Sequence, residues 1–395
     1  MKSSKSMWSL ETNKKRKTTT TTEKKKLSPN PSLPDDLLLS IVARVSRLYY
    51  PTLSLVSKSF RSLLASPELY KARSLSGHTE SCLYVCLQCC PGYRWFTLCR
   101  KPDQTLSNYT TKKKSSGYVL ATVPIPSFQK GSFSSLVAVG SDIYNIGGSN
   151  YHGPSYSVSI LDCRSHTWRE APRLRVEQLC LSASVLDRKI YVAGCYNDSD
   201  SNSLKNFLEV FDTKTQIWDT EPIACSGRID NFLYSKSTCI DGKFHVVTER
   251  EGVIAYDSKK GRWDRTGQSL YYLIYSNSFC EIENVLYFVS DGEFMWYDTE
   301  LKMWRDMEGL VGRLSRLPPD VSVRLADNSG KLAVLWEEED LPYCRPGFTG
   351  MKKIWCVEIA LEKRKSKILG KIEWFDHVLT VPAENDLVKV LAATV

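Results

Sequence analysis

The stretch Leu161-Asp162-Cys163-Arg164-Ser165-His166-Thr167-Trp168 sets the pattern of this chain: an apolar residue, an aspartate, five mostly polar residues and a tryptophan. The pattern recurs at 211–218, 256–263 and 297–304, so successive tryptophans are 50, 45 and 41 residues apart. Self-similar segments at a near-constant spacing of this size are typical of propellers and solenoids, in which each repeat is one supersecondary unit. The spacing therefore predicts a repeat architecture, and the function has to be sought outside the repeated residues.

The residues around each tryptophan predict four short strands per repeat. In the first full repeat these strands are expected at 134–139, 143–146, 158–161 and around Trp168. Turn sequences such as Asp241-Gly242 separate apolar runs rich in Val, Ile, Tyr and Phe, which is a strong local indication of β-hairpins. We expect the repeated aspartate to accept backbone N–H groups in the turn between the third and fourth strands. We expect the tryptophan to pack one repeat against the next.

A fifth repeat and two end fragments complete the count. The fifth repeat is degenerate, and its strands are expected at 321–326, 331–336, 354–360 and 368–374. The fragments are two N-terminal strands, 83–87 and 94–98, and two C-terminal strands, 378–381 and 387–391. Joined, they would form a sixth unit whose two inner strands come from the C-terminus, which closes the ring and removes exposed sheet edges. The sequence thus predicts an all-β, six-bladed β-propeller.

The net charge of +9 is concentrated in an N-terminal tail. Residues 1–30 hold nine Lys or Arg against two Glu, a net charge of +7. A basic tail is poor evidence for a nucleic-acid-binding body, and its Thr, Ser and Lys content predicts disorder. The basic runs 14–17 and 24–26 are compatible with a nuclear-import signal and equally with a merely solvated tail.

Targeting and membrane signals are also informative. The tail lacks the apolar segment of a secretory signal, and no apolar run is long enough to cross a bilayer. We therefore expect an intracellular protein with no membrane partner, in the nucleus, the cytoplasm or both. Its 13 cysteines are then expected as thiols.

Residues 33–72 have helical rather than strand periodicity. Pro34 stands where a helix would begin and Asp35-Asp36 fall in its first turn, which suits the helix dipole. Apolar residues then follow at helical spacing. Two further short helices are expected, one opening at Pro51 and one that stops near Pro67. Because forty residues rarely sustain a core of their own, we expect a partner or the propeller to cover this apolar segment.

This segment closely resembles the F-box, on the runs Leu33-Pro34-Asp35-Asp36-Leu37-Leu38 and Leu55-Val56-Ser57-Lys58. Asp36 stands where the family usually has Glu, and Phe60 where it usually has Trp. Members of the family bind a Skp-type adaptor, so the resemblance implies a contact face. Its residues are Leu33, Pro34, Leu37, Ile41, Pro51, Leu53, Val56 and Phe60. A helical cap docked on the propeller is the alternative, but burial of the helices in a partner's groove accounts better for the pattern.

The repeats resemble the kelch motif, which has a diglycine after the second strand and a spaced aromatic–tryptophan pair. The match is good at Gly147-Gly148, partial at Gly194-Cys195, and without glycine in the next two repeats. An F-box followed by a degenerate kelch propeller resembles the plant F-box/kelch-repeat family over residues 33–392. We therefore expect an F-box over 31–75 and a kelch-type propeller over 80–395, after the basic tail over 1–30 whose composition predicts disorder.

Catalytic and metal sites find little support. The spacing of Cys82, Cys86, Cys89 and Cys90 is not that of a zinc site, and a predicted strand runs through this segment. Ordinary thiols are therefore the better interpretation. The five histidines show no ligand spacing, and we expect His245 to be a hydrogen-bonded core residue. We therefore predict a non-catalytic protein without metal or other cofactor.

Taken together, the resemblances imply a substrate-recognition subunit of an SCF-type cullin ubiquitin ligase. The F-box would bind the Skp-type adaptor, and through it a cullin, while the propeller would bind an unknown target protein. Such a subunit acts by proximity rather than by bond chemistry. A kelch scaffold outside any ligase and, more distantly, a propeller enzyme are the alternatives. Adaptor co-purification tests the first, and bound metal or turnover tests the second.

The connections between strands predict where a target would bind. In an up-and-down blade, the link between the second and third strands and the link to the next blade share one side of the ring. These links are long here (149–157, 196–205, 337–351, 171–179, 219–233 and 306–320), and variable loops on a rigid scaffold are where binding residues concentrate. Among the aromatic and arginine residues that favour hot spots, we expect contributions from Tyr151, Tyr196, Arg173, Arg175, Arg228 and Tyr343.

Overall fold

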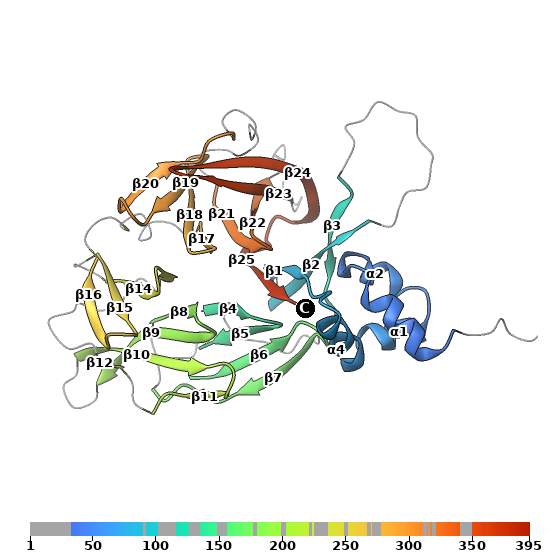
Figure 1. Cartoon of the computed structure of the whole chain (residues 1–395), viewed down its shortest axis with the longest axis horizontal. Helices are drawn as coiled ribbons and strands as arrows, with labels where there is room; N and C mark the ends of the chain where they lie inside the picture. The colour runs from blue at the N-terminus through green and yellow to red at the C-terminus, as the bar shows by residue number, and fades with distance from the viewer. Residues whose placement is uncertain are drawn as a thin grey trace, which may run out of the picture.

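In a computed structural model, the chain forms a ring of β-sheets with a group of short helices beside it (Figure 1). The structure describes residues 33–89, 92–101, 116–125, 135–147, 156–176, 180–198, 203–220, 223–224, 236–248, 252–266, 270, 278–310, 314, 317, 321–339 and 350–395. The predicted basic tail over 1–30 lies outside these residues. Within them, no helix is long and apolar enough to span a membrane.

The helical segment has four α-helices and one 3-10 helix, where the sequence predicts three helices. They are α1 (Asp35–Ala43), η1 (Arg47–Tyr49), α2 (Tyr50–Leu53), α3 (Lys58–Leu64) and α4 (Pro67–Leu75). Helix α3 ends at Leu64, near Pro67 as predicted. The additional helix α4 begins at Pro67, because the first turn of a helix leaves its N–H groups unbonded anyway. The Ser66 hydroxyl caps this helix by accepting a hydrogen bond from the Leu69 N–H at 3.3 Å.

The helices share a small core of their own, which the sequence-based size argument does not anticipate. Its buried residues are Val42, Ala43, Tyr50, Leu64 and Leu69. Tyr70 of α4 faces the other way and packs with propeller residues, among them Tyr84 and Trp95. The helical segment is therefore both internally packed and covered on one side by the propeller.

Six antiparallel sheets make up the propeller, which confirms the predicted blade count. From inner to outer strand, blade I is β25 (Asp386–Thr394), β1 (Ser81–Cys89), β2 (Gly92–Arg100) and β3 (Tyr118–Thr122). Blade II is β4 (Ser135–Val139), β5 (Asp142–Ile146), β6 (Val158–Asp162) and β7 (Thr167–Ala171). Blade III is β8 (Cys180–Leu186), β9 (Lys189–Asp198), β10 (Ser203–Asp212) and β11 (Ile217–Trp218), with β12 (Ile223–Ala224) also paired to β10.

The remaining blades follow the same order. Blade IV is β13 (Ser237–Ile240), β14 (Lys243–Val247), β15 (Val253–Asp257) and β16 (Arg262–Arg265). Blade V is β17 (Phe279–Ile282), β18 (Val285–Ser290), β19 (Glu293–Asp298) and β20 (Met303–Asp306). Blade VI is β21 (Val323–Asn328), β22 (Lys331–Glu339), β23 (Met351–Arg364) and β24 (Lys367–Pro382).

The ring closes through one C-terminal strand rather than the predicted two. β25 pairs antiparallel with β1, with Ser81 opposite Thr394. Residues 378–381, predicted as an inner strand of the closing blade, are the end of the 16-residue strand β24 of blade VI. The runs 83–87 and 94–98 are consequently the second and third strands of blade I, and β3 is the fourth. An apolar run does not show where one long strand ends, so the sequence pattern alone divides β24 incorrectly.

The repeated aspartate has the role that the sequence predicts. In all four copies its Oδ1 accepts backbone N–H groups of the following turn, at 2.8 Å for Arg164 N to Asp162 and 3.1 Å for Lys259 N to Asp257. The bonds at Asp212 and Asp298 are equivalent, at 2.8 and 3.1 Å. These bonds fix the turn that places the tryptophan opposite the apolar residue of the motif.

The repeated tryptophan joins each blade to the one before it, as predicted. Trp168 of blade II lies 6.3 Å from Trp95 of blade I, between ring centroids. Trp218 of blade III donates its indole N–H to the Pro172 carbonyl, after blade II, at 2.8 Å. Trp263 and Trp304 pack into the corresponding cores between blades III and IV and between blades IV and V. The apolar cores of the ring therefore lie between blades.

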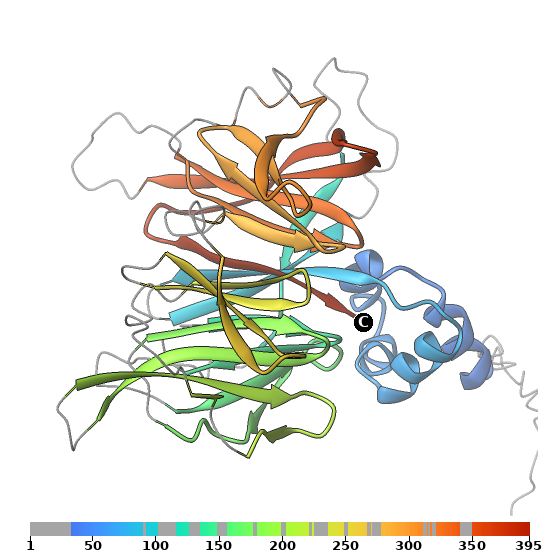
Figure 2. The same cartoon turned by 60° about the vertical axis from the view of Figure 1, so that its left-hand side comes forward.

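The two faces of the ring differ in what they carry (Figure 2). The inner strand of every blade ends on the face next to the helices, where two-residue turns lead into the second strand at 140–141, 187–188, 241–242, 283–284 and 329–330. We call this the helix face. The inner strands begin on the opposite face, which we call the loop face because the links between blades emerge there.

Candidate functional site

Part of the helical segment presents large apolar side chains to solvent. Five of them form what we call the apolar set, with these exposed fractions: Leu33 53%, Leu37 48%, Ile41 46%, Leu55 76% and Val56 63%. Leu37 and Ile41 are four residues apart and lie on one side of α1, and Leu33 precedes the helix. Val42 and Ala43 of the same helix are buried in the helical core. Helix α1 therefore has one face for the core and one apolar face left uncovered.

The eight predicted adaptor contacts divide into two groups. Leu33, Pro34, Leu37, Ile41 and Val56 are exposed, whereas Pro51, Leu53 and Phe60 are half-buried. Leu53 and Phe60 pack against the helical core, so they support the exposed residues from below. Leu55 is missing from the prediction although it is the most exposed member of the set. Its apolar character next to Val56 was the available signal.

A buried arginine ties the helices together. Arg73 of α4 is only 2% exposed and donates hydrogen bonds to the carbonyls of Ala43 and Val45, at 3.0 and 2.7 Å. It also donates to the Tyr50 hydroxyl at 3.0 Å and forms an ion pair with Glu80 at 2.8 Å. Its two terminal nitrogens are thus bonded, whereas its buried Nε makes no hydrogen bond in the described residues. A buried guanidinium needs a compensating charge, so Glu80 stabilises the packing of α1, α2 and α4.

Glu80 also fixes the helices to the propeller. Besides Arg73, its carboxylate accepts a hydrogen bond from the Ser46 hydroxyl at 2.8 Å and one from the Arg47 backbone N–H. Its own backbone pairs with Val395, the last residue of the chain, with N–O distances of 3.0 and 2.9 Å. One residue therefore joins the helical core, the start of β1 and the end of β25.

Arg47 makes a second connection, to blade II. Its guanidinium donates to the Cys163 carbonyl at 3.0 Å and lies 3.5 Å from His166 Nε2. The Tyr84 hydroxyl of blade I approaches the same two groups, at 2.8 and 3.0 Å. Burial and the nearby Arg47 cation lower the pKa of His166 to about 4, so its ring is neutral at neutral pH and can accept a hydrogen bond. The turn 163–166 of blade II is thereby part of the junction.

On the loop face, three of the six predicted target contacts are described. Arg173 and Arg175 are exposed in the link from blade II to blade III, with the Arg173 guanidinium 5.3 Å from the Tyr156 ring centroid. Arg175 donates its backbone N–H to the buried Glu209 carboxylate at 3.3 Å, which leaves its position fixed. Tyr196 is half-buried and packs edge-on against Phe207.

Two of the loops predicted for this face need correction, and three of the predicted contacts lie outside the described residues. The predicted loop 196–205 is largely strand, because β9 extends as far as Asp198 and β10 begins at Ser203. Residues 337–339 likewise belong to β22. Tyr151, Arg228 and Tyr343 lie outside the described residues. The structure therefore places Arg173, Arg175 and Tyr196 on the face opposite the helices and leaves their role as target contacts a prediction.

The other residues weighed as chemical groups have structural settings. Cys82, Cys86 and Cys89 lie along β1, and burial raises the pKa of Cys82 to about 11; Cys90 is outside the described residues. Over the described ranges, no three His, Cys, Asp or Glu side chains gather as a metal site would require. His245 is buried in β14, but neither ring nitrogen makes a hydrogen bond of normal geometry, so the predicted hydrogen-bonded core histidine is only partly right. Burial lowers its pKa to about 4.

Comparison with known proteins decides the family. Residues 31–72 match the F-box domain, and residues 95–379 match the FKB95, Kelch-repeats domain. The chain belongs to the plant F-box/kelch-repeat family. It is 64% identical over 370 residues to the F-box/kelch-repeat protein At5g51250 of Arabidopsis thaliana, covering 92% of this chain and 99% of the relative. The helical segment is thus an F-box and the ring a kelch propeller.

Two further relatives from Arabidopsis thaliana are also F-box/kelch-repeat proteins by name. The F-box/kelch-repeat protein At3g06570 is 54% identical, over 92% of this chain and 93% of its own length. The F-box/kelch-repeat protein At4g39550 is 48% identical, over 98% of this chain and 100% of its own length. An F-box joined to a kelch propeller fits a substrate-recognition role in ubiquitin ligases, and F-box/kelch proteins are generally non-catalytic adaptors.

Proposed function

We propose that this protein is a substrate-recognition subunit of an SCF-type cullin ubiquitin ligase. In this role its F-box binds a Skp-type adaptor, which links it to a cullin, and its propeller binds a target protein for ubiquitination. The observation that carries the proposal is the apolar set, whose five large side chains stay exposed although the F-box has a packed core. Exposed apolar clusters on soluble domains mark surfaces that a partner covers.

The two-faced ring supports the same role. The F-box is joined to the helix face through Glu80, Val395 and Arg47, whereas the inter-blade links that would contact a target emerge on the loop face. A receptor of this shape would hold its target at a defined distance and orientation from the adaptor. Such positioning converts the encounter between a target lysine and the ubiquitin carrier into an effectively intramolecular step.

Co-purification from plant cells tests the proposal. The full-length protein with an epitope tag should recover a Skp-type adaptor and a cullin, and the double variant Leu55→Asp/Val56→Asp should lose both. Leu55 and Val56 suit this test because they are exposed, so the aspartates do not enter the helical core. Leu53, half-buried against that core, would confuse loss of binding with unfolding.

A matched control is available on the propeller. Leu301 is 61% exposed, in the turn between β19 and β20, and Leu301→Asp makes the same chemical change far from the F-box in sequence. This variant should recover the adaptor and the cullin as the wild type does. If the wild type recovers neither, the protein acts outside such a ligase and is better described as a kelch scaffold. If Leu55→Asp/Val56→Asp still recovers both, the apolar set is not the adaptor contact and the observation that carries the proposal is refuted.

A further inference from the structure

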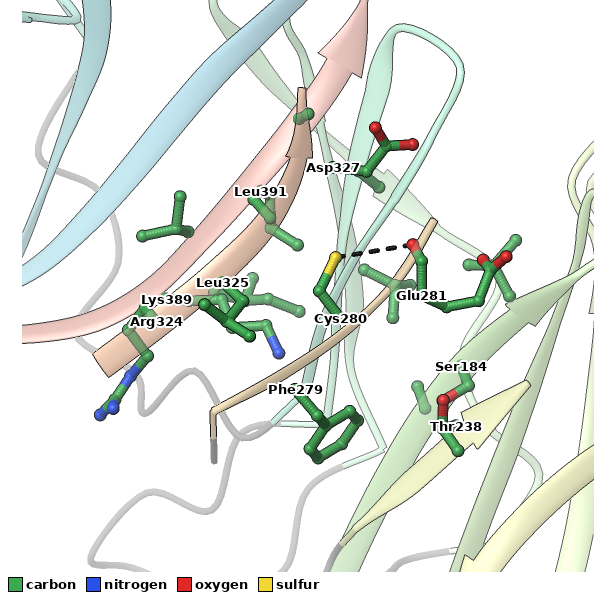
Figure 3. Close-up of a pocket in the computed structure, with 18 of the residues that line it drawn as sticks. Ser184, Thr238, Phe279, Cys280, Glu281, Arg324, Leu325, Asp327, Lys389 and Leu391 are labelled. Carbon is green, nitrogen blue, oxygen red and sulfur yellow. Dashed lines mark hydrogen bonds between the residues drawn. The ribbon is translucent and has the colours of Figure 1, made fainter. Parts of the chain in front are cut away.

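The centre of the propeller contains a cavity of about 700 Å³. The inner strands of all six blades line it, and residues 79–81 lie at the end next to the F-box. Its volume is within the range of small-molecule sites, roughly 300 to 1,000 Å³. Figure 3 shows part of its wall, with side chains from blades I, III, IV, V and VI.

Position along an inner strand corresponds to depth in this cavity. The starts of neighbouring inner strands lie side by side: Ser278, just before β17, donates to the carbonyl of Val323 at the start of β21 at 2.8 Å. Near the start of the next pair, Arg324 Nε donates to the carbonyl of Val388 at 3.1 Å. Early residues of each inner strand therefore lie toward the loop face, and late residues toward the F-box.

The charged residues of the cavity are sorted by depth. The cations come early in their strands or just before them: Lys236, Arg324 and Lys389. The carboxylates come late, or follow the F-box directly: Glu80, Glu281 and Asp327. In Figure 3, Lys389 and Arg324 lie together on one side of the view, and Glu281 and Asp327 lie on the other. The two signs are thus separated, and the loop-face half of the cavity is cationic.

Lys389 is the group that this arrangement leaves uncompensated. Its side chain faces the cavity, and within the described residues no carboxylate lies within ion-pair distance of its ammonium. Lys389 is exposed to the cavity, and the surrounding ring removes part of its hydration, which lowers its pKa; the neighbouring Arg324 cation lowers the pKa further. None of the three cavity carboxylates neutralises the charge of Lys389. Glu80 pairs with Arg73, while Glu281 and Asp327 accept backbone N–H groups of nearby turns.

The wall opposite Lys389 is hydroxylic rather than apolar. Ser182 and Ser184 of blade III both place Oγ 2.8 Å from Ser237 Oγ of blade IV, and Thr238 follows in the same strand. All four residues are buried by protein yet line the cavity. Hydroxyl groups can donate and accept, so this wall can bind the polar body of a ligand whose charged end is elsewhere.

We infer that the loop-face half of the cavity is a binding site for a small organic anion, held at its carboxylate or phosphate group by Lys389 and Arg324 and along its body by the serine and threonine hydroxyls of blades III and IV. The inference is independent of the ligase role, because it depends only on the inner strands. A cavity that merely holds solvent gives no reason to separate the cations from the acids that could neutralise them. An anionic ligand supplies the missing partner for Lys389.

Thermal unfolding of the full-length protein, followed by tryptophan fluorescence, tests the inference. Citrate and pyrophosphate are the probes, each compared with sodium chloride at equal ionic strength. One or both should raise the unfolding temperature saturably. Response to citrate alone identifies a carboxylate ligand, and response to pyrophosphate alone a phosphate ligand. No saturable response to either, beyond that of sodium chloride, overturns the inference.

Two lysine variants show whether the response comes from the cavity. Lys389→Gln should raise the half-saturating anion concentration at least about tenfold, since one charge-assisted contact is lost. Its unfolding temperature without anions should equal or exceed that of the wild type, because an uncompensated cation is removed. Lys363→Gln, an exposed lysine on β23 outside the cavity, should respond like the wild type. Equal responses of both variants contradict the inference.

A measurement on the unmodified chain does not depend on variants that fold. Limited acylation of lysines, read by mass spectrometry, should label Lys389, and saturating citrate or pyrophosphate should protect it while Lys363 stays reactive. Equal labelling of Lys389 with and without the probes overturns the inference. Adaptor co-purification should be unchanged by Lys389→Gln, so failure of this inference and failure of the proposed ligase role give different results.

Discussion

Glu80 and Val395 pair through both of their backbone hydrogen-bonding groups, at 3.0 and 2.9 Å, so the residue that follows the F-box is fixed to the last residue of the propeller. The neighbouring Thr394 N–H donates to the Gly140 carbonyl of blade II at 2.8 Å. The closure of the ring and the attachment of the F-box are therefore one structural feature. Whatever weakens β25 should loosen both domains.

Removing β25 should open the ring. A chain that ends at residue 385 loses the inner strand of blade I and the buried side chains Leu387, Val390 and Ala393, which belong to the cores on both sides of that blade. The edge of β1 would be left unpaired. We expect an aggregated or protease-sensitive product by size-exclusion chromatography and limited proteolysis. A monomer with the melting temperature of the full chain would show that the ring does not depend on this strand.

Replacing Glu80 should release the F-box from the propeller. Glu80→Ala leaves the buried Arg73 guanidinium without its carboxylate, and losing one partner of a buried pair typically costs about 3 kcal/mol, less here because Glu80 is 29% exposed. We expect a drop of about 2 kcal/mol in the free energy of unfolding, measured by denaturant titration. Glu362→Ala, which breaks the exposed pair with Arg364, should leave stability unchanged. Equal effects of the two variants would contradict the role assigned to Glu80.

Acid should weaken the junction between pH 6.5 and 4. The pKa of His166 is lowered to about 4 in the folded protein, from about 6.5 in an unfolded chain. Because the folded pKa is the lower one, the unfolded state binds more protons in this range. The stabilising effect of the neutral ring is complete above pH 6.5 and is lost as the pH falls toward 4.

The variant His166→Asn isolates this contribution, since asparagine tolerates the positive φ of 56° at this position. In this variant the free energy of unfolding should change less between pH 4 and 6.5 than in the wild type. The difference should be up to about 3 kcal/mol over this range. His245 has a similarly lowered pKa and should account for part of the remaining slope. An unchanged slope in His166→Asn would mean that the junction does not sense protons through this ring.

Target capture should depend on the loop face. Replacing Arg173, Arg175 and Tyr196 together with Ala removes side chains that point from the rigid ends of blades II and III. The Arg175 backbone bond to Glu209 is kept, so stability should change little. Proximity labelling in cells should lose a set of labelled proteins, while adaptor binding and melting temperature stay at wild-type values. Loss of that set on changing the short turns 187–188 and 241–242 instead would place target binding on the helix face.

The repeat made the propeller predictable because its chemistry is local. Asp162 bonds the backbone of the turn that follows it, and Trp168 lies opposite Leu161 in the same pair of strands. The spacing of the two residues therefore indicates the hairpin of each blade from sequence alone. The end of β24 was not predictable, because the strand keeps its pairing with β23 through two register shifts, between Ile354 and Trp355 and between Glu358 and Ile359. Each shift interrupts the alternation of apolar and polar residues, so the sequence pattern reads one long strand as two.

The candidate sites also contain some residues that the sequence pattern predicts and others that only the fold brings together. The exposed positions of α1 follow from helical periodicity, and the structure differs from the sequence mainly at Leu53, which packs inward, and Leu55, which does not. The junction of Arg47, Tyr84 and His166 joins residues far apart in the chain and has no sequence signal of its own. The same holds for Lys389, because the cavity that it faces is formed by inner strands far from it in the sequence.

The affinity of the purified full-length protein for a purified plant Skp-type adaptor tests the central claim most directly. Leu37→Ala on α1 should raise the dissociation constant at least about tenfold. This is the effect expected when a hot-spot side chain worth about 2 kcal/mol of binding is lost. Leu301→Ala on the propeller should leave the constant unchanged. Tight wild-type binding with this difference is the predicted result; no binding, or equal binding by the two variants, would contradict the assignment of the apolar set to the adaptor.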